Sequence, residues 1–76
     1  MIWSYNAKQH RWEAIAHGWR AIAQRAPNRL DWEAAIEALE GGAREASPVV
    51  FRESDAAREW CEAALGRICK VSVVPH

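Results

Sequence analysis

The segment R-L-D-W-E-A-A-I-E-A, residues 29–38, decides the fold that this 76-residue sequence predicts. Apolar and polar side chains alternate along it, and nine of its ten positions fit a strand with one apolar and one polar face. A helix beginning at Asp31 would leave Leu30 and Ala34 outside its apolar stripe. The alternation therefore favours a strand over residues 30–38.

The chain before this segment admits two interpretations. Residues 12–26 are rich in Ala and carry apolar side chains at the 3.6-residue spacing of an amphipathic helix. The same residues also alternate as two strands around a two-residue turn at His17-Gly18, which would pair Ala16 with Trp19. The lack of Thr and the scarcity of Val before residue 49 favour the helix, whereas Gly18 would weaken that helix by about 1 kcal/mol.

Turn signals favour the strands. They recur at the spacing of a β-meander, at residues 6–10, 17–18, 27–28 and 41–42. We therefore predict strands near residues 2–6, 11–16, 19–25 and 30–38. In the central hairpin, Ala14 would lie opposite Ala21 and Trp12 opposite Ala23, and residues 40–47 are expected to form a loop.

These strands would gather large and small apolar side chains on one face of the sheet. That face would carry Trp3, Tyr5, Trp12, Ala14, Ala16, Trp19, Ala21, Ala23, Trp32 and Ala34. The alanines leave room that large side chains fill, as a close-packed interior requires. A second element is needed to cover this face.

Residues 54–66, S-D-A-A-R-E-W-C-E-A-A-L-G, supply that element as an amphipathic helix. Its apolar stripe consists of Ala57, Trp60, Cys61, Ala64, Leu65 and Ile68. Ser54 suits the N-cap and Gly66 a left-handed C-cap, and Trp60 is expected to pack on the alanines of the sheet. Residues 68–74 are expected to form a last strand or a tail on the helix. The sequence thus predicts an α+β fold, a small antiparallel β-meander packed against one C-terminal helix.

Length and composition indicate a single domain over residues 1–76. The sequence contains no run of about 18 apolar residues and no secretory signal pattern, so we expect a cytoplasmic protein that does not bind membranes. Cys61 and Cys69 are expected to be reduced structural thiols, because disulfides belong to oxidising compartments.

Charge is unevenly distributed along the chain, although the formal net charge is zero. Residues 1–30 carry five basic side chains and one acidic one, whereas residues 31–65 carry nine acidic and three basic ones. Two interpretations follow: a solvated surface of mixed sign, or opposed basic and acidic patches that dock on a charged partner.

The sequence contains no pattern that indicates an enzyme, a metal site or a cofactor site. The candidate metal ligands, which lack the spacing of a structural zinc site, are His10, His17, Cys61, Cys69 and His76. A catalytic nucleophile requires a base and an orienting acid beside it, but Cys61 belongs to the apolar stripe of the helix and Cys69 to the expected last strand. Gly41-Gly42 lacks the Lys and Ser or Thr of a phosphate-binding loop. We therefore expect a protein that is not an enzyme and that holds no cofactor or metal.

Repeated W-x-A units begin at Trp12, Trp19 and Trp32, and A-A-R-E-W-C-E-A-A-L follows at residues 56–65. In these features, over about residues 3–65, the chain resembles short uncharacterised proteins of phages, prophages and their bacterial hosts. The resemblance implies a strand meander followed by one helix. Some phage proteins of this size are anti-CRISPRs, which bind a CRISPR effector complex and block it without catalysis. The resemblance therefore implies a protein partner, but it identifies no inhibitory residue.

The polar face of the predicted sheet is the candidate partner-binding surface. Its residues are Arg11, Glu13, Ile15, Arg20, Ile22, Glu33 and Glu37. Two isoleucines on neighbouring strands, surrounded by both charge signs, are typical of a protein contact. We therefore expect a small binding or inhibitor protein. A homodimer is also expected, formed through an unpaired sheet edge and through contacts between the basic and acidic segments of two copies.

A small nucleic-acid-binding protein is the alternative. The first half of the chain carries the basic residues Lys8, His10, Arg11, Arg20, Arg25 and Arg29. A basic sheet with exposed aromatic side chains can follow a phosphate backbone. The tryptophans, however, are expected to be buried in the core, which would leave few rings for stacking on bases.

Overall fold

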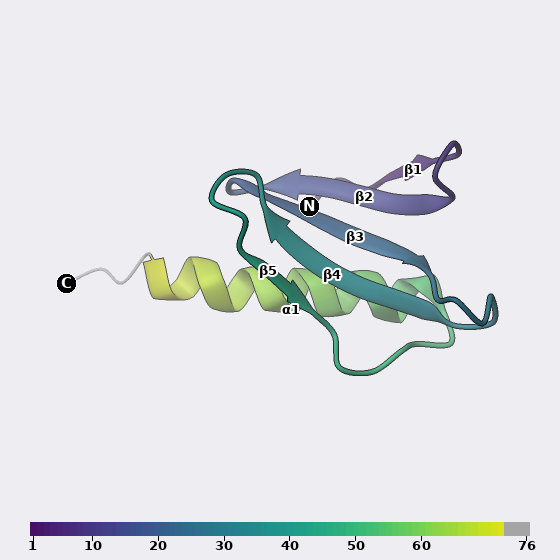
Figure 1. Cartoon of the computed structure of the whole chain (residues 1–76). Coiled ribbons are helices and arrows are strands. Elements are labelled where there is room, and N and C mark those ends of the chain that lie inside the picture. The colour runs from purple at the N-terminus through teal and green to yellow at the C-terminus, as the bar shows by residue number, and fades with distance from the viewer. Residues whose placement is uncertain (73–76) are drawn as a thin grey trace.

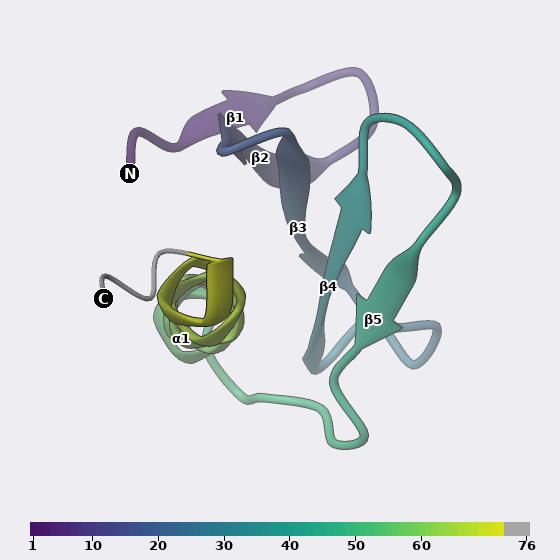
Figure 2. The same cartoon turned by 90° about the vertical axis from the view of Figure 1, so that its left-hand side faces the viewer.

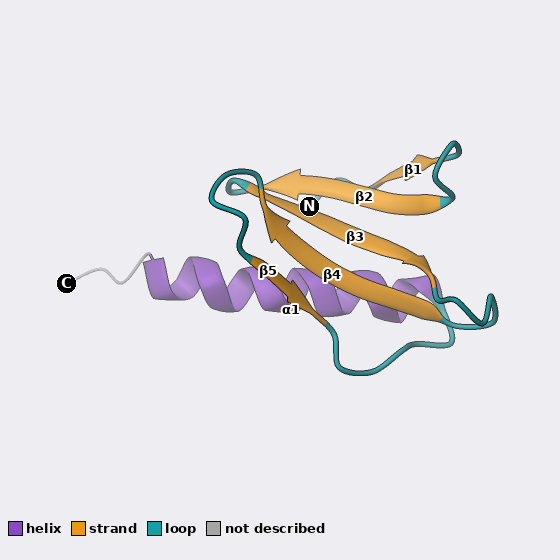
Figure 3. Cartoon of the chain, in the orientation of Figure 1, coloured by secondary structure: helices purple, strands orange, loops and turns teal. Residues whose placement is uncertain are grey.

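Five antiparallel strands and one helix make up the fold (Figure 1). The computed structural model describes the backbone of residues 1–72 and the side chains of residues 1–68. The elements are β1 Ser4–Asn6, β2 Arg11–Ala16, β3 Trp19–Arg25, β4 Trp32–Ala38, β5 Arg44–Ala46 and α1 Ser54–Ser72. Strand order in the sheet follows the chain, from β1 to β5, so the sheet is a meander (Figure 3). The predicted α+β fold is confirmed.

The fold has two layers. Viewed along the helix, α1 lies on one side of the curved sheet, and no other described element covers the opposite side (Figure 2). The helix contacts mainly β3 and β4, the central strands. We call the covered side the inner face and the uncovered side the outer face.

The central hairpin has the predicted register. Ala16 lies opposite Trp19, Ala14 opposite Ala21 and Trp12 opposite Ala23, so the helical interpretation of residues 12–26 is wrong. His17 and Gly18 form the turn with φ angles of 55° and 80°. A two-residue turn with two positive φ angles matches the twist of the strands it joins, and Gly18 adopts its conformation without steric cost.

Strand β5 lies within residues 40–47, where the sequence indicated only a loop. Gly41 and Gly42 have φ angles of 87° and 77°, so the chain turns sharply after β4 and returns alongside it. The Ala38 N–H donates to the Ala43 carbonyl (2.8 Å), and β5 then pairs with β4. With three residues, β5 is too short to show a periodic pattern in the sequence.

Helix α1 is longer than the sequence indicated. It continues through Gly66 to Ser72, so the predicted C-cap at Gly66 and the predicted strand beyond it are wrong; residues 73 and 74 of that segment lie outside the described chain. Gly66 is on the exposed side of the helix, while Ile68 continues the apolar stripe and packs against the core. Burial of that stripe outweighs the cost of one glycine in the helix. Within the described chain, no helix is long and apolar enough to cross a membrane.

The contact between helix and sheet is made mainly by small side chains. The fully or almost fully buried cluster comprises Ala14, Ala21, Ala23, Ala34 and Ile36 from the sheet and Ala57, Cys61, Ala64 and Leu65 from the helix. Trp60 packs, as expected, against the cluster that contains the sheet alanines, but its side chain is only half-buried. Because alanine faces alanine, the helix backbone approaches the sheet closely.

Cys61 contacts the backbone of both central strands. Its side chain is fully buried, and its Sγ lies 3.5 Å from the carbonyl oxygens of both Ile22 and Ala35. The S–H proton is therefore shared between two backbone acceptors of neighbouring strands. Removal from water raises the pKa of the Cys61 thiol to about 11. Cys61 is free of disulfide bonds and acts as a small core residue.

The tryptophans surround this small-residue centre. Trp3, Trp12, Trp19, Trp32 and Trp60 are all half-buried and pack against the cluster from its periphery. Trp3 also donates from its Nε1 to Glu62 Oε2 at 2.9 Å, which ties the chain before β1 to the helix. Each tryptophan thus buries one part of its ring system and leaves another part accessible.

Replacing Gly66 by Ala should stabilise the protein. Gly66 lies within a helix, its φ is not positive, and an added Cβ meets no atom within 4 Å. The expected gain in the free energy of unfolding is about 1 kcal/mol, which raises the melting temperature of a small domain by about 4–8 °C.

Gly18→Ala is the matched control, because it adds the same methyl group in equally open space but at a φ of 80°. It should destabilise the protein by about 1 kcal/mol or more. Thermal unfolding followed by circular dichroism measures both variants. Destabilisation by Gly66→Ala would contradict the helical assignment at this residue.

Stability should decrease between about pH 9 and pH 11 because of Cys61. In this range the unfolded chain loses the thiol proton while the folded state retains it, so deprotonation favours unfolding. Urea unfolding of the wild type and of Cys61→Ala across pH 7–11 should show a steeper decrease for the wild type. Parallel pH curves would contradict a buried, protonated thiol.

Candidate functional site

The outer face is the largest part of the sheet that no described element covers. Cross-strand pairing arranges its side chains in rows that run across the strands. One row consists of Ile15, Arg20, Glu37 and Arg44, a second of Ser4, Glu13, Ile22, Ala35 and Ala46, and a third of Asn6, Arg11, Gln24 and Glu33. All seven residues predicted for partner binding therefore lie on this face.

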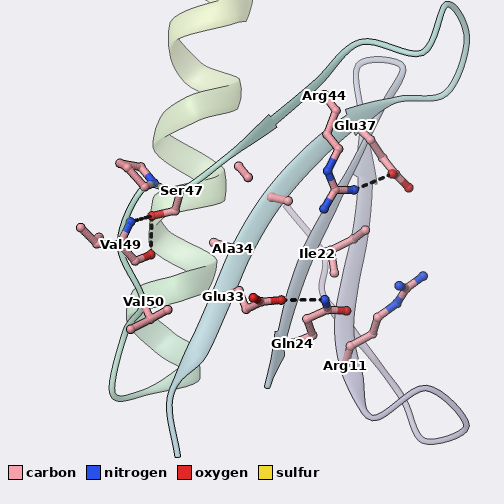
Figure 4. A pocket seen from close by; sticks show the side chains of 13 residues that line it. Arg11, Ile22, Gln24, Glu33, Ala34, Glu37, Arg44, Ser47, Val49 and Val50 are labelled. Atoms are coloured by element: carbon pink, nitrogen blue, oxygen red, sulfur yellow. Dashed lines mark hydrogen bonds and ion pairs between the residues drawn. The ribbon is translucent and has the colours of Figure 1, made fainter. Parts of the chain in front are cut away.

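Ion pairs and hydrogen bonds join the polar side chains within each row. Glu37 accepts from Arg20 Nη1 at 3.1 Å and from Arg44 Nη1 at 3.2 Å, so one carboxylate bridges two arginines from β3 and β5. Gln24 Nε2 donates to Glu33 Oε1 at 2.9 Å in the next polar row. Figure 4 shows the Arg44–Glu37 ion pair and the Gln24–Glu33 hydrogen bond at the edge of a hollow in this face.

Glu13 is bound by two neighbours. Arg11 Nε donates to its Oε2 in a short ion pair, and Asn6 Nδ2 donates to its Oε1 at 3.5 Å. The hydrogen bond from Arg11 is the main reason that the pKa of Glu13 lies below its usual value. The carboxylate therefore stays ionised at neutral pH and holds Arg11 in place.

Basic and acidic segments of the sequence interleave on the outer face. Strand β3 comes from the basic part of the chain and β4 from the acidic part, and their register places Arg20 opposite Glu37. The opposed patches that the charge distribution suggested do not occur on this face. It presents alternating, mutually compensated charges instead.

The two predicted isoleucines differ in exposure. Ile15 is 62% exposed because β1 pairs only with residues 11–13 of β2, so Ile15 has a neighbouring strand on one side only. Ile22 lies on the central strand β3 between Glu13 and Ala35 and is 5% exposed. The expectation that Ile22 supplies an exposed apolar contact is therefore wrong.

Two hollows indent the outer face. A hollow of about 280 Å³ is bounded by β3, β4 and residues 46–50, with Ile22 at its floor and the half-exposed Val49 and Val50 at its side (Figure 4). A shallower hollow of about 490 Å³ lies toward β1 and is lined by Ile2, Ile15 and Arg20, among others. Ile2 is 87% exposed. We call these the valine hollow and the isoleucine hollow.

The sequence pattern did not predict that Val49 and Val50 line a hollow of the outer face. Residues 48–51 form a short apolar run that was expected only to connect the sheet with the helix. Strand β5 and the hydrogen bond from Ser47 N–H to the Ala34 carbonyl (2.9 Å) bring this run beside β4. The sequence did show an apolar run just before the helix N-cap. It could not show that this run lies beside β4, because that position depends on strand β5, which the sequence did not predict.

The described residues offer little for metal or nucleophilic chemistry. Among them, no group of three His, Cys, Asp or Glu side chains is placed to hold a metal ion. Cys61 is fully buried and its raised pKa keeps the thiol protonated, so it lacks the properties of a nucleophile. The side chains of Cys69 and His76 lie outside the described part of the chain.

Comparison with known proteins found no matching family model, and neither the curated proteins nor the solved structures gave a match.

Proposed function

We propose that the protein is a non-enzymatic binding protein that acts by placing the outer face of its sheet on a larger protein partner. The observation that carries this proposal is the pair of strongly exposed isoleucines, Ile2 and Ile15, at one hollow of a face whose charges are already compensated. Exposed apolar side chains bordered by polar groups are typical of protein interfaces.

The compensated charges favour a protein over a nucleic acid as the partner of this face. Arg11, Arg20 and Arg44 each contact a carboxylate of this chain, so none of them offers a free positive charge to a phosphate. A surface of alternating charges instead fits a protein surface with its own alternating charges, which determine partner choice and orientation.

The resemblance to short phage proteins suggests which partner to test first. As part of this proposal, the protein acts in the cytoplasm of a bacterial cell as an anti-CRISPR, and it blocks a CRISPR effector complex by occupying part of its surface. This mode of action needs no reaction and no cofactor.

Ile15→Ser should abolish partner binding and leave the fold intact. Ile15 is 62% exposed, so its replacement should change the free energy of unfolding by less than about 0.5 kcal/mol. Leu30→Ser is the matched control, because Leu30 is 76% exposed but lies in the turn before β4. Affinity capture from a bacterial lysate and a plasmid-interference assay with the host's CRISPR effector should both lose their signal with Ile15→Ser alone.

Equal capture and equal interference by wild type, Ile15→Ser and Leu30→Ser would contradict the assignment to the outer face. Recovery of nucleic acid alone, in amounts that fall steeply with added salt, would contradict a protein partner.

We also propose that two copies of the chain associate through a sheet edge. The edge strands of the described sheet are β1 and β5, and each presents one side without a neighbouring strand. Arg20 and Glu37 pair within one chain, so a dimer does not need the ionic contacts between copies that the sequence suggested.

Light scattering at increasing concentration should therefore give a mass approaching twice 8.6 kDa, and the dimer should persist at high salt because backbone hydrogen bonds hold it. A mass fixed at that of the monomer would contradict edge pairing. Dissociation by salt alone would assign the contact to charges instead.

A further inference from the structure

A third hollow lies away from the outer face and joins aromatic with basic side chains. It has a volume of about 740 Å³ and is lined by Tyr5, His10, Trp12, Arg25, Arg29 and Trp32. These residues come together at the end of the sheet where the β1–β2 turn, residues 7–10, and the β3–β4 turn, residues 26–31, both lie (Figure 1). We call it the aromatic–basic hollow.

Positive charge in this hollow is not neutralised by the described chain. Neither Arg25 nor Arg29 forms an ion pair with a described carboxylate, and none of the lining residues is acidic. The nearby carboxylate of Asp31 accepts a hydrogen bond from Asn28 Nδ2 at 2.9 Å. This arrangement contrasts with the outer face, where the arginines contact carboxylates, and it favours an anionic ligand.

The rings of the hollow are partly accessible and held in place. Tyr5 is 48% exposed and meets Trp12 edge to face, with ring centroids 5.3 Å apart. The Arg25 guanidinium lies 4.6 Å from the ring centroid of Trp32, and that of Arg58 lies 4.5 Å from the centroid of Trp12. Arg58 also donates to the Asp55 carboxylate and to the Ser54 carbonyl. Arg25 forms no ion pair with a described carboxylate, so its N–H donors remain available for a phosphate.

The two turns beside the hollow are fixed by asparagine side chains. Asn28 Oδ1 accepts from the N–H groups of Leu30 and Asp31, at 2.9 and 3.1 Å, and Asn6 Oδ1 accepts from the Gln9 N–H at 3.1 Å. These hydrogen bonds support the left-handed conformations of Arg29 and His10, with φ angles of 62° and 54°. The basic residues of the turns are therefore held at the rim by local structure.

We infer that the aromatic–basic hollow binds a short segment of single-stranded nucleic acid. A base stacks on the exposed ring of Tyr5 and a neighbouring base contacts the accessible part of Trp32, while Arg25 and Arg29 contact the phosphates. A single strand is favoured over a duplex because paired bases hide the faces on which the rings would stack. This site is independent of the outer face, so a protein partner there and a nucleic acid here are compatible.

The inference is tested by fluorescence anisotropy with a labelled 12-nucleotide oligo(dT) and the corresponding oligo(U), in a salt series from low to physiological concentration. The wild type should bind at low salt and lose affinity as salt increases. Arg29→Asn removes one charge and keeps a residue that tolerates the left-handed conformation. It should weaken binding several-fold and make the slope of log K against log salt shallower by about 0.7.

Trp32→Leu removes one ring and should weaken binding about tenfold or more at every salt concentration. Arg44→Gln is the matched control, because it removes the same charge from the outer face and should leave the affinity unchanged. Circular dichroism establishes that the variants are folded. If Trp32→Leu does not fold, Arg29→Asn against Arg44→Gln decides the question, because both residues are exposed.

Competition separates a nucleic-acid strand from other polyanions. Unlabelled oligo(dT) should displace the probe, whereas inorganic polyphosphate and duplex DNA should compete far less well. Absence of binding to both oligonucleotides at low salt would overturn the inference. Equal competition by polyphosphate, or equal weakening by Arg29→Asn and Arg44→Gln, would overturn it as well.

Discussion

The close contact between α1 and the two central strands is the constraint on which the rest of the structure depends. Alanines at the centre of the inner face meet Ala57, Cys61 and Ala64 of the helix, and the Cys61 Sγ reaches two backbone carbonyls of the sheet. Apart from Ile36 and Leu65, small side chains fill this buried contact and leave no room for an indole at its centre. The tryptophans are therefore excluded from the centre and occupy its periphery.

Because the tryptophans lie at the periphery of the core, parts of their rings remain accessible at the surface. A tryptophan in the centre of a core has no accessible ring face, whereas the peripheral Trp12 and Trp32 contribute to packing and still line the aromatic–basic hollow. The argument that tryptophans needed by the core are lost for binding thus does not hold for this chain. Small residues at the centre give a 76-residue domain both a packed core and accessible aromatic side chains.

Strand positions and the register of the central hairpin could be predicted from the sequence, because period-two alternation and the His17-Gly18 turn each have a local physical cause. Features that depend on tertiary contacts could not be predicted from the sequence. The helix continues through Gly66, and Ile68 beyond it packs against the core. Ile22 is buried because β3 is a central strand. For the candidate surface, alternation along each strand predicted which face a residue lies on. The exposure of its side chain and the ion pair between Arg20 and Glu37 depend on which strands are neighbours, and the sequence did not predict them.

The ion pairs distinguish the outer face from the aromatic–basic hollow, although one basic segment of the sequence supplies arginines to both. Arg20 and Arg25 lie five residues apart in the same basic segment and on the same strand, yet an odd separation places them on opposite faces of the sheet. Arg20 forms an ion pair with Glu37 of the neighbouring strand β4, whereas Arg25 lies opposite Trp32 of the same strand and stacks on its ring. Since a carboxylate neutralises one arginine and an indole leaves the other charged, only the second retains its full attraction for an anion. Alternation along β3 thus separates a charge-compensated face suited to a protein from a basic hollow suited to a phosphate backbone.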